Sequence, residues 1–145
     1  MVQKATEIGV DMITPIIFQK TIKTNLNFKR LETIALEAIE QSERLEKVSI
    51  NEIFDFKQIL LKKIFDGDIN IIFNKTGDDF VEFFDKIKIK KEKRINIFIG
   101  PEGGFSADEL FLAEQNGFKI INLGNTNLRA ETAAILATFV INNLI

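Results

Sequence analysis

The most constraining feature of the sequence is a glycine-rich loop that separates an apolar strand from a helix. Residues 95–99 predict a short strand, and Gly100-Pro101-Glu102-Gly103-Gly104-Phe105 follows it directly. The glycines of this hexapeptide, the first glycine loop, let the main chain turn sharply and approach a ligand with no Cβ in between. Such a loop is typical of an α/β protein that binds its ligand at the carboxyl ends of parallel strands.

The first glycine loop leads into a helix whose two ends can be predicted. Ser106 and Glu109 have the spacing of a capping box, so the helix is expected to begin directly after Ser106. Asn116-Gly117 predicts its end, and residues 119–123 predict the next strand. Strand, loop, helix and strand together form one βαβ unit.

A second glycine-containing loop, residues 123–129, leaves that strand and enters an apolar C-terminal helix at about 130–144. We call it the second glycine loop. We expect the two loops to leave neighbouring parallel strands and to face each other across one crevice.

The rest of the chain predicts alternating helices and strands. Helices are expected at 2–9, 27–45 with Asn27 as N-cap, 55–64 and 78–85; strands are expected at 12–18 with an interruption at Pro15, 48–54, and 68–73 followed by a turn at 74–77. The lysine-rich run 86–94 favours an exposed loop or a lysine-protected edge strand over a nucleic-acid contact. With no internal repeat and no linker, the 145 residues predict one domain.

Composition excludes several kinds of chemistry. The chain has no cysteine and no histidine, which removes disulfides, the usual zinc sites and imidazole general bases. Its formal net charge of −2 is not that of a general nucleic-acid binder. No apolar run is long enough to span a bilayer and no signal pattern is present, so we expect a soluble, cytosolic protein with no membrane partner and no metal.

The loops by themselves predict only a broad ligand class. Helix N-termini favour anions and nucleotides, but the sequence lacks the Gly-Lys-Ser/Thr ending of an NTPase loop and the Gly-x-Gly-x-x-Gly spacing of a dinucleotide fold. Main-chain groups in such loops can instead hold an adenine and a ribose. The residues therefore predict an adenosine-like ligand.

The motifs also resemble a known family. Residues 100–106 with Glu109, then Leu123-Gly124 and residues 128–133, are similar to the signature of the RsmE-type ribosomal RNA methyltransferases of the SPOUT, or α/β-knot, superfamily. Residues 3–10 and 37–44 agree with the same family. The resemblance covers nearly the whole chain, in order.

The resemblance implies an enzyme that transfers the methyl group of S-adenosylmethionine to N3 of a uridine in 16S ribosomal RNA of the small subunit. It implies an α/β fold with a parallel sheet flanked by helices and a C-terminal deep trefoil knot, in a homodimer. Family members usually carry an N-terminal RNA-binding domain of the PUA type. Because the sequence begins where the catalytic domain would begin, we expect residues 1–145 to be that single domain and the RNA-binding domain to be absent.

The resemblance also implies roles for particular residues. Arg129 would stabilise the deprotonated uracil; Glu131 would orient Arg129 or accept a proton, or would only stabilise the dipole of the C-terminal helix. Lys4, Gln41 and Arg44 are candidates for RNA contact; the alternative for Gln41 and Arg44 is a solvated helix end, with Arg44 near the C-terminal dipole. The candidates for cofactor binding are Asn74, Gly100, Pro101, Glu102, Gly103, Leu123, Gly124, Leu128 and Thr132, the last of which is alternatively a helix cap.

The sequence leaves two alternatives to the enzyme open. One is a nucleotide-binding module without catalysis, in which the loops hold ATP or an adenosine metabolite. The other is a degenerate methyltransferase that survives as an RNA-binding or dimerisation scaffold. Binding of S-adenosylmethionine but not ATP, together with methyl transfer, separates the enzyme from both.

Overall fold

A three-stranded parallel sheet forms the centre of the C-terminal part of the chain in the computed structural model, which describes residues 1–22, 24–86 and 93–144. Its strands are β5 (Ile69–Asp79), β6 (Ile95–Phe98) and β7 (Lys119–Asn122), in the order β6-β5-β7. Ile71 in β5 lies opposite Ile97 on one side and Lys119 on the other. The predicted parallel sheet is confirmed.

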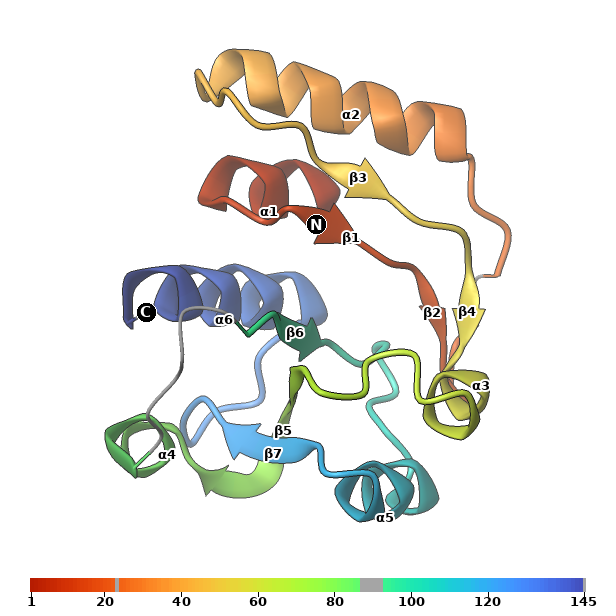
Figure 1. Cartoon of the computed structure of the whole chain (residues 1–145), viewed down its shortest axis with the longest axis vertical. Helices are drawn as coiled ribbons and strands as arrows, with labels where there is room; N and C mark the ends of the chain where they lie inside the picture. The colour runs from red at the N-terminus through yellow and green to blue at the C-terminus, as the bar shows by residue number, and fades with distance from the viewer. Residues whose placement is uncertain (23, 87–92, 145) are drawn as a thin grey trace.

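The N-terminal part contains two short parallel strand pairs and two helices. β1 (Met12–Ile13) pairs with β3 (Ser49–Ile50), and β2 (Ile16–Ile17) pairs with β4 (Phe54–Asp55). Pro15 separates β1 from β2, which is the predicted interruption. Figure 1 shows α1 (Val2–Ile8) and α2 (Phe28–Gln41) beside the β1–β3 pair, with α6 (Ala130–Leu144) between α1 and the three-stranded sheet.

Helices cover both faces of the three-stranded sheet, because side chains along β5 alternate between them. Ile72 belongs to a buried cluster with residues of α3 (Phe56–Leu61) and α5 (Ala107–Gln115). Ile71 and Phe73 belong to a second cluster with residues of α6, against which α4 (Phe80–Lys86) also packs. Most of the described phenylalanines belong to these two clusters or pack against them, as their lack of a polar group predicts.

Two helices end earlier than the sequence predicts. α2 ends at Gln41 and not near residue 45, and α3 ends at Leu61 and not at 64. Glu43 and Lys63 have φ angles of 55° and 49°, so each helix ends in a left-handed residue that is not glycine. Because the usual C-terminal signal is glycine, the apolar periodicity alone extended both helices too far.

The predicted turn at 74–77 appears as an irregularity within β5. Phe73 and Asp78 both lie opposite Ile121 of β7, so the residues between them bulge out of the strand pairing. A Cβ on Gly77 would lie 2.4 Å from the Ile120 carbonyl carbon, which shows how closely the two main chains approach here. Most of the predicted lysine-rich run, residues 87–92, lies outside the described residues.

The strand order corrects the expectation that the two glycine loops leave neighbouring strands. β5 lies between β6 and β7, because the connection through α5 carries the chain across β5 before β7 begins. The regularly paired part of β5 stops at Phe73, and this point, which we call the end of β5, therefore lies between the two glycine loops. In the described part of the chain no helix has both the length and the apolar character needed to cross a membrane.

Candidate active site

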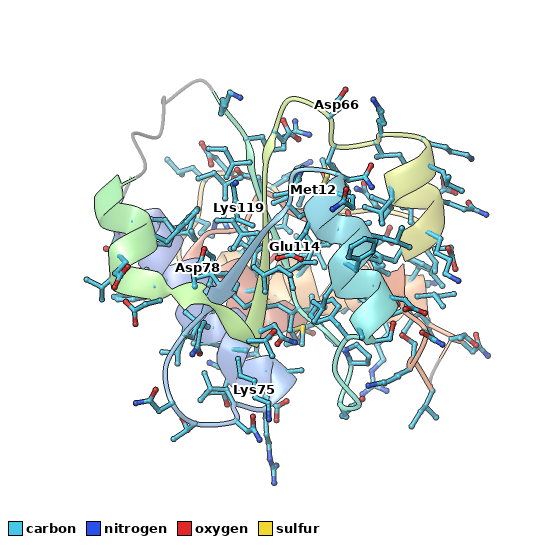
Figure 2. The ribbon with its side chains drawn as sticks, turned by 90° about the horizontal axis from the view of Figure 1, so that it is seen from below. Met12, Asp66, Lys75, Asp78, Glu114 and Lys119 are labelled. Carbon is cyan, nitrogen blue, oxygen red and sulfur yellow. The ribbon has the colours of Figure 1, made fainter. Side chains whose placement is uncertain are left out.

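A cavity of about 730 Å³ lies at the carboxyl ends of the three strands of the β6-β5-β7 sheet. The end of β5, the first glycine loop, the second glycine loop and the first turn of α6 all contribute to its lining. Figure 2 shows Lys75 at this end of β5 and Asp66 at the opposite end. The crevice predicted from the two loops therefore exists, with a third strand end between its walls.

Most of the residues predicted for the cofactor and for catalysis meet at this cavity. Arg129 and Glu131 line it, both with exposed side chains. Thr132 is the exception, since it lies exposed in the first turn of α6 outside the lining. The lining contains the other predicted cofactor residues Asn74, Gly100, Pro101, Glu102, Gly103, Leu123, Gly124 and Leu128.

Several lining residues were missed by sequence reasoning. Phe73 and Lys75 flank Asn74 where the regular pairing of β5 stops, and Ala133 lies one residue beyond Thr132 on α6. Most of these residues are sequence neighbours of predicted ones. They could have been found by extending each predicted segment by one or two residues. The remaining missed residues are Ile99, Gly104, Phe105, Asn122, Thr126, Asn127 and Ala130.

The first glycine loop forms a turn that runs directly into a capped helix. Gly104 N donates to the Pro101 carbonyl at 2.8 Å, and Gly104 has the left-handed φ of 67° that glycine allows. Ser106 Oγ accepts from Glu109 N while Glu109 Oε2 accepts from Ser106 N at 2.8 Å. The predicted capping box is confirmed, and it fixes where the loop ends and α5 begins.

Two glycines of this loop make room for packing within the protein. A Cβ on Gly100 would lie 3.0 Å from the ring of Phe105, which is itself buried. A Cβ on Gly103 would lie 3.1 Å from Cβ of Lys20. The sequence predicts that these glycines let a ligand approach, and the structure adds that a Cβ at either position would be tightly packed against the protein behind the loop.

Arg129 directly precedes α6, at the other wall of the cavity. Its carbonyl accepts from Ala133 N at 2.9 Å, so the main chain of Arg129 starts the helix while its side chain is exposed. Glu131 follows as the acidic residue of the first turn, where a carboxylate stabilises the helix dipole. No ion pair joins the two side chains among the described residues.

The three predicted RNA contacts lie on the N-terminal helices or just after them, and none of them lines the cavity. The Arg44 guanidinium, with the side chain 13% exposed, donates to the carbonyls of Thr6 at 2.6 Å and Val10 at 2.9 Å. This contact joins the ends of α1 and α2. Lys4 pairs with Glu7 at 2.7 Å, and Gln41 is exposed at the end of α2.

The cavity combines the properties needed for a ligand with apolar, polar and charged parts. Its volume is within the usual range of about 300–1,000 Å³ for sites that hold small molecules and cofactors. Ile99, Leu123 and Leu128 supply apolar surface, and the glycine loops supply main-chain groups that can donate and accept hydrogen bonds. Charged side chains of both signs lie around it: Lys75, Arg129, Glu102 and Glu131.

Comparison with known proteins adds a family to this geometry. The model of a family described as RNA methyltransferase domain matches residues 1–142. The chain is 34% identical over 137 residues to ribosomal RNA small subunit methyltransferase E of Rickettsia conorii, covering 94% of this chain and 55% of that protein. It is 35% identical over 140 residues to the protein of the same name from Mesomycoplasma hyopneumoniae, covering 92% of this chain and 59% of that protein.

Solved structures give the same result. Ribosomal RNA small subunit methyltransferase E of Neisseria gonorrhoeae, bound to S-adenosylmethionine, superposes with a TM-score of 0.85 at 28% identity over 99% of this chain and 59% of that one. A Legionella pneumophila protein in complex with the same cofactor superposes with a TM-score of 0.81 at 26% identity, over 98% of this chain and 59% of that one. The parallel sheet flanked by helices is therefore shared with these proteins, and this chain spans little more than half of their length.

Proposed function

The chain belongs to the RNA methyltransferase domain family, and from this premise we propose that it binds S-adenosylmethionine and methylates N3 of a uridine in 16S ribosomal RNA. The observation that carries the proposal is the cavity on which three strand ends and the start of α6 converge. Relatives named ribosomal RNA small subunit methyltransferase E supply the substrate class.

The residues around the cavity fit the proposed cofactor. S-adenosylmethionine joins a flat adenine and a ribose to a charged methionine part, so its site needs apolar surface, main-chain hydrogen bonds and charges of both signs. We assign the adenosine part to the first glycine loop and to Leu123, Gly124 and Leu128. These residues supply the apolar surface and the main-chain hydrogen bonds. Lys75 and Glu102 are the sequence neighbours of Asn74 and Gly103 and line the same cavity. Their charged side chains are available to bind the methionine part.

Arg129 is the residue to which we assign stabilisation of the reacting base. The bound cofactor supplies an electrophilic methyl group, and N3 of uridine can attack it only as its proton is lost. Loss of that proton leaves negative charge shared between N3 and the neighbouring carbonyl oxygens. An exposed guanidinium at the rim of the cavity is suited to stabilise this charge through hydrogen bonds that strengthen as the charge develops.

Glu131 is the nearest carboxylate in sequence to Arg129 and also lines the cavity. We propose that it accepts the N3 proton, directly or through water, since the chain has no histidine to do so. The absence of an ion pair with Arg129 in the described residues leaves its carboxylate available for this role.

The resemblance to the family also implies a chain topology, an oligomeric state and RNA contacts. We propose that the segment from β6 to α6 is threaded as a deep trefoil knot, that two chains form a homodimer, and that residues 1–145 are one catalytic domain acting in the cytoplasm on the small ribosomal subunit or its RNA. Lys4, Gln41 and Arg44 remain the proposed RNA contacts. For Arg44 the contact would be additional to its hydrogen bonds with Thr6 and Val10.

Cofactor binding is the test that this chain must pass by itself. Titration calorimetry should detect binding of S-adenosylmethionine and S-adenosylhomocysteine and no binding of ATP. Binding of ATP alone would support the non-catalytic nucleotide-binding module instead. Incubation of small-subunit particles with methyl-labelled cofactor, followed by nucleoside mass spectrometry, should then yield 3-methyluridine; its absence alongside normal cofactor binding would favour the scaffold.

A further inference from the structure

The turn that follows β2 lies directly against the first glycine loop, although the two are far apart in sequence. Lys20 Nζ donates to the carbonyls of Gly103 at 3.1 Å and Phe105 at 3.3 Å, across 83 and 85 residues of chain. The aliphatic stem of Lys20 packs on Gly103, where a Cβ would lie 3.1 Å from Lys20 Cβ and 3.2 Å from Lys20 Cδ. Lys20 itself is absent from the cavity lining, so it contacts the loop from outside.

The two carbonyls that Lys20 binds belong to peptide groups whose amides are also held. The peptide between Gly103 and Gly104 has its N–H bonded to the Pro101 carbonyl at 2.8 Å. The peptide between Phe105 and Ser106 has its N–H bonded to Glu109 Oε2 at 2.8 Å. Because a peptide group is planar, a hydrogen bond at each end fixes its rotation about the chain. In both peptide groups, Lys20 is the donor that binds the carbonyl oxygen.

The residues next to Lys20 keep its main chain in place for this contact. Gln19 N donates to the other carboxylate oxygen of Glu109 at 2.7 Å, and Glu109 is only 2% exposed. Phe18 N donates to Thr21 Oγ1 at 2.9 Å, which closes the turn. The ring of Phe18 packs edge-on against that of Phe105, with 5.0 Å between the ring centroids. The turn is thus anchored to both the loop and the start of α5.

We propose that Lys20 is a positioning residue for cofactor binding, which sets two peptide groups of the first glycine loop in the orientation that the cofactor requires. The assignment rests on the proposed function of the cavity. Without the Lys20 ammonium the two peptide groups can rotate, and the free energy needed to reorder them is subtracted from the binding of the cofactor.

The test compares three variants of the whole chain by calorimetry with S-adenosylhomocysteine. Lys20→Met keeps the stem and removes the donors, Lys20→Arg restores donors, and Lys29→Met is the matched control on α2, where the lysine is exposed. We expect Lys20→Met to weaken binding about tenfold, as loss of one charge-assisted interaction does, with the arginine variant within about threefold and the control unchanged.

A second measurement separates positioning from general stability. Amide hydrogen exchange followed by NMR without ligand should show faster exchange at Gly104 and Ser106 in Lys20→Met, while the thermal midpoint shifts by only a few degrees. If Lys20→Met lowers the midpoint but binds as tightly as the wild type, or leaves both amides equally protected, Lys20 has no positioning role. A wild-type chain that binds no S-adenosylhomocysteine would instead overturn the proposed function, and this assignment with it.

Discussion

The two glycine loops that form opposite walls of the cavity are held in different ways. The first glycine loop is joined to Lys20, which is remote in sequence, and it runs into the capping box, whose Glu109 bonds to the equally remote Gln19. The second glycine loop has local bonds only: within the described residues, Gly124 N donates to Asn122 Oδ1 at 3.0 Å, and the Arg129 carbonyl accepts from α6. Its residues 124–127 are all exposed.

The difference indicates that the first glycine loop is ordered before a ligand binds and that the second glycine loop adjusts on binding. A loop held by tertiary bonds is already ordered before a ligand arrives, so little free energy is lost in arranging it. A loop with local bonds and exposed residues opens at low cost and can adjust to what enters. The wall that carries Arg129 is the adjustable one, which suits a residue that must meet a substrate as large as RNA.

The largest loss of stability is expected where β7, which leads into the second glycine loop, packs closely against β5. Gly77→Ala would place Cβ 2.4 Å from the Ile120 carbonyl group, and neither main chain can move without breaking the β5–β7 pairing. We expect a loss of about 3 kcal/mol in the free energy of unfolding, measured by urea denaturation. Gly67→Ala, whose Cβ would have nothing within 4 Å, is the control and should lose about 1 kcal/mol through its φ of 87° alone. Equal losses would show that this contact is no more rigid than a surface turn.

The next effect tests the chemical side of the second wall. Arg129→Ala should lower methylation of small-subunit particles about 100-fold, because the guanidinium acts on charge that develops at the base. Affinity for S-adenosylhomocysteine should stay within about threefold of the wild type. Arg30→Ala, an exposed arginine on α2, is the control. Unchanged methylation would remove Arg129 from the mechanism, and lost cofactor affinity would make it part of the cofactor site.

A smaller effect is expected at the buried carboxylate that braces the first wall. Glu109→Ala leaves the amides of Gln19 and Ser106 without their acceptor, and should reduce the free energy of unfolding by about 2 kcal/mol. Glu114→Ala, exposed on the same helix, should change it by less than about 0.5 kcal/mol. If the two variants were equally stable, the first wall would not depend on its tertiary bonds.

The smallest effect is expected within the second wall itself. Gly124 has a φ of 136°, and an added Cβ would have nothing within 4 Å, so Gly124→Ala should cost only the conformational strain of the main chain, about 1 kcal/mol by urea denaturation. A loss as large as that of Gly77→Ala would contradict the view that this wall can adjust.

Much of the fold follows from local sequence signals. The capping box at Ser106, the N-cap at Asn27 and the apolar helix at the C-terminus all appear where the sequence predicts them. The ends of α2 and α3 were placed too late, since Glu43 and Lys63 carry no local signal for the left-handed conformation they adopt. The two loops could be predicted from their glycines, which allow sharp turns and close approach of a ligand, and the resemblance to the family supplied the individual cofactor residues.

The sequence by itself determined most of the elements and the two loops, because caps, turns and apolar periodicity act between residues close together in the chain, and the resemblance of its motifs identified the family. Only the tertiary structure decided that β5 lies between the two loop-bearing strands, and that Lys20 and Gln19 bind the first glycine loop and the start of α5, more than eighty residues away. Contacts at such separation depend on how the whole chain packs, and no local pattern of residues encodes them.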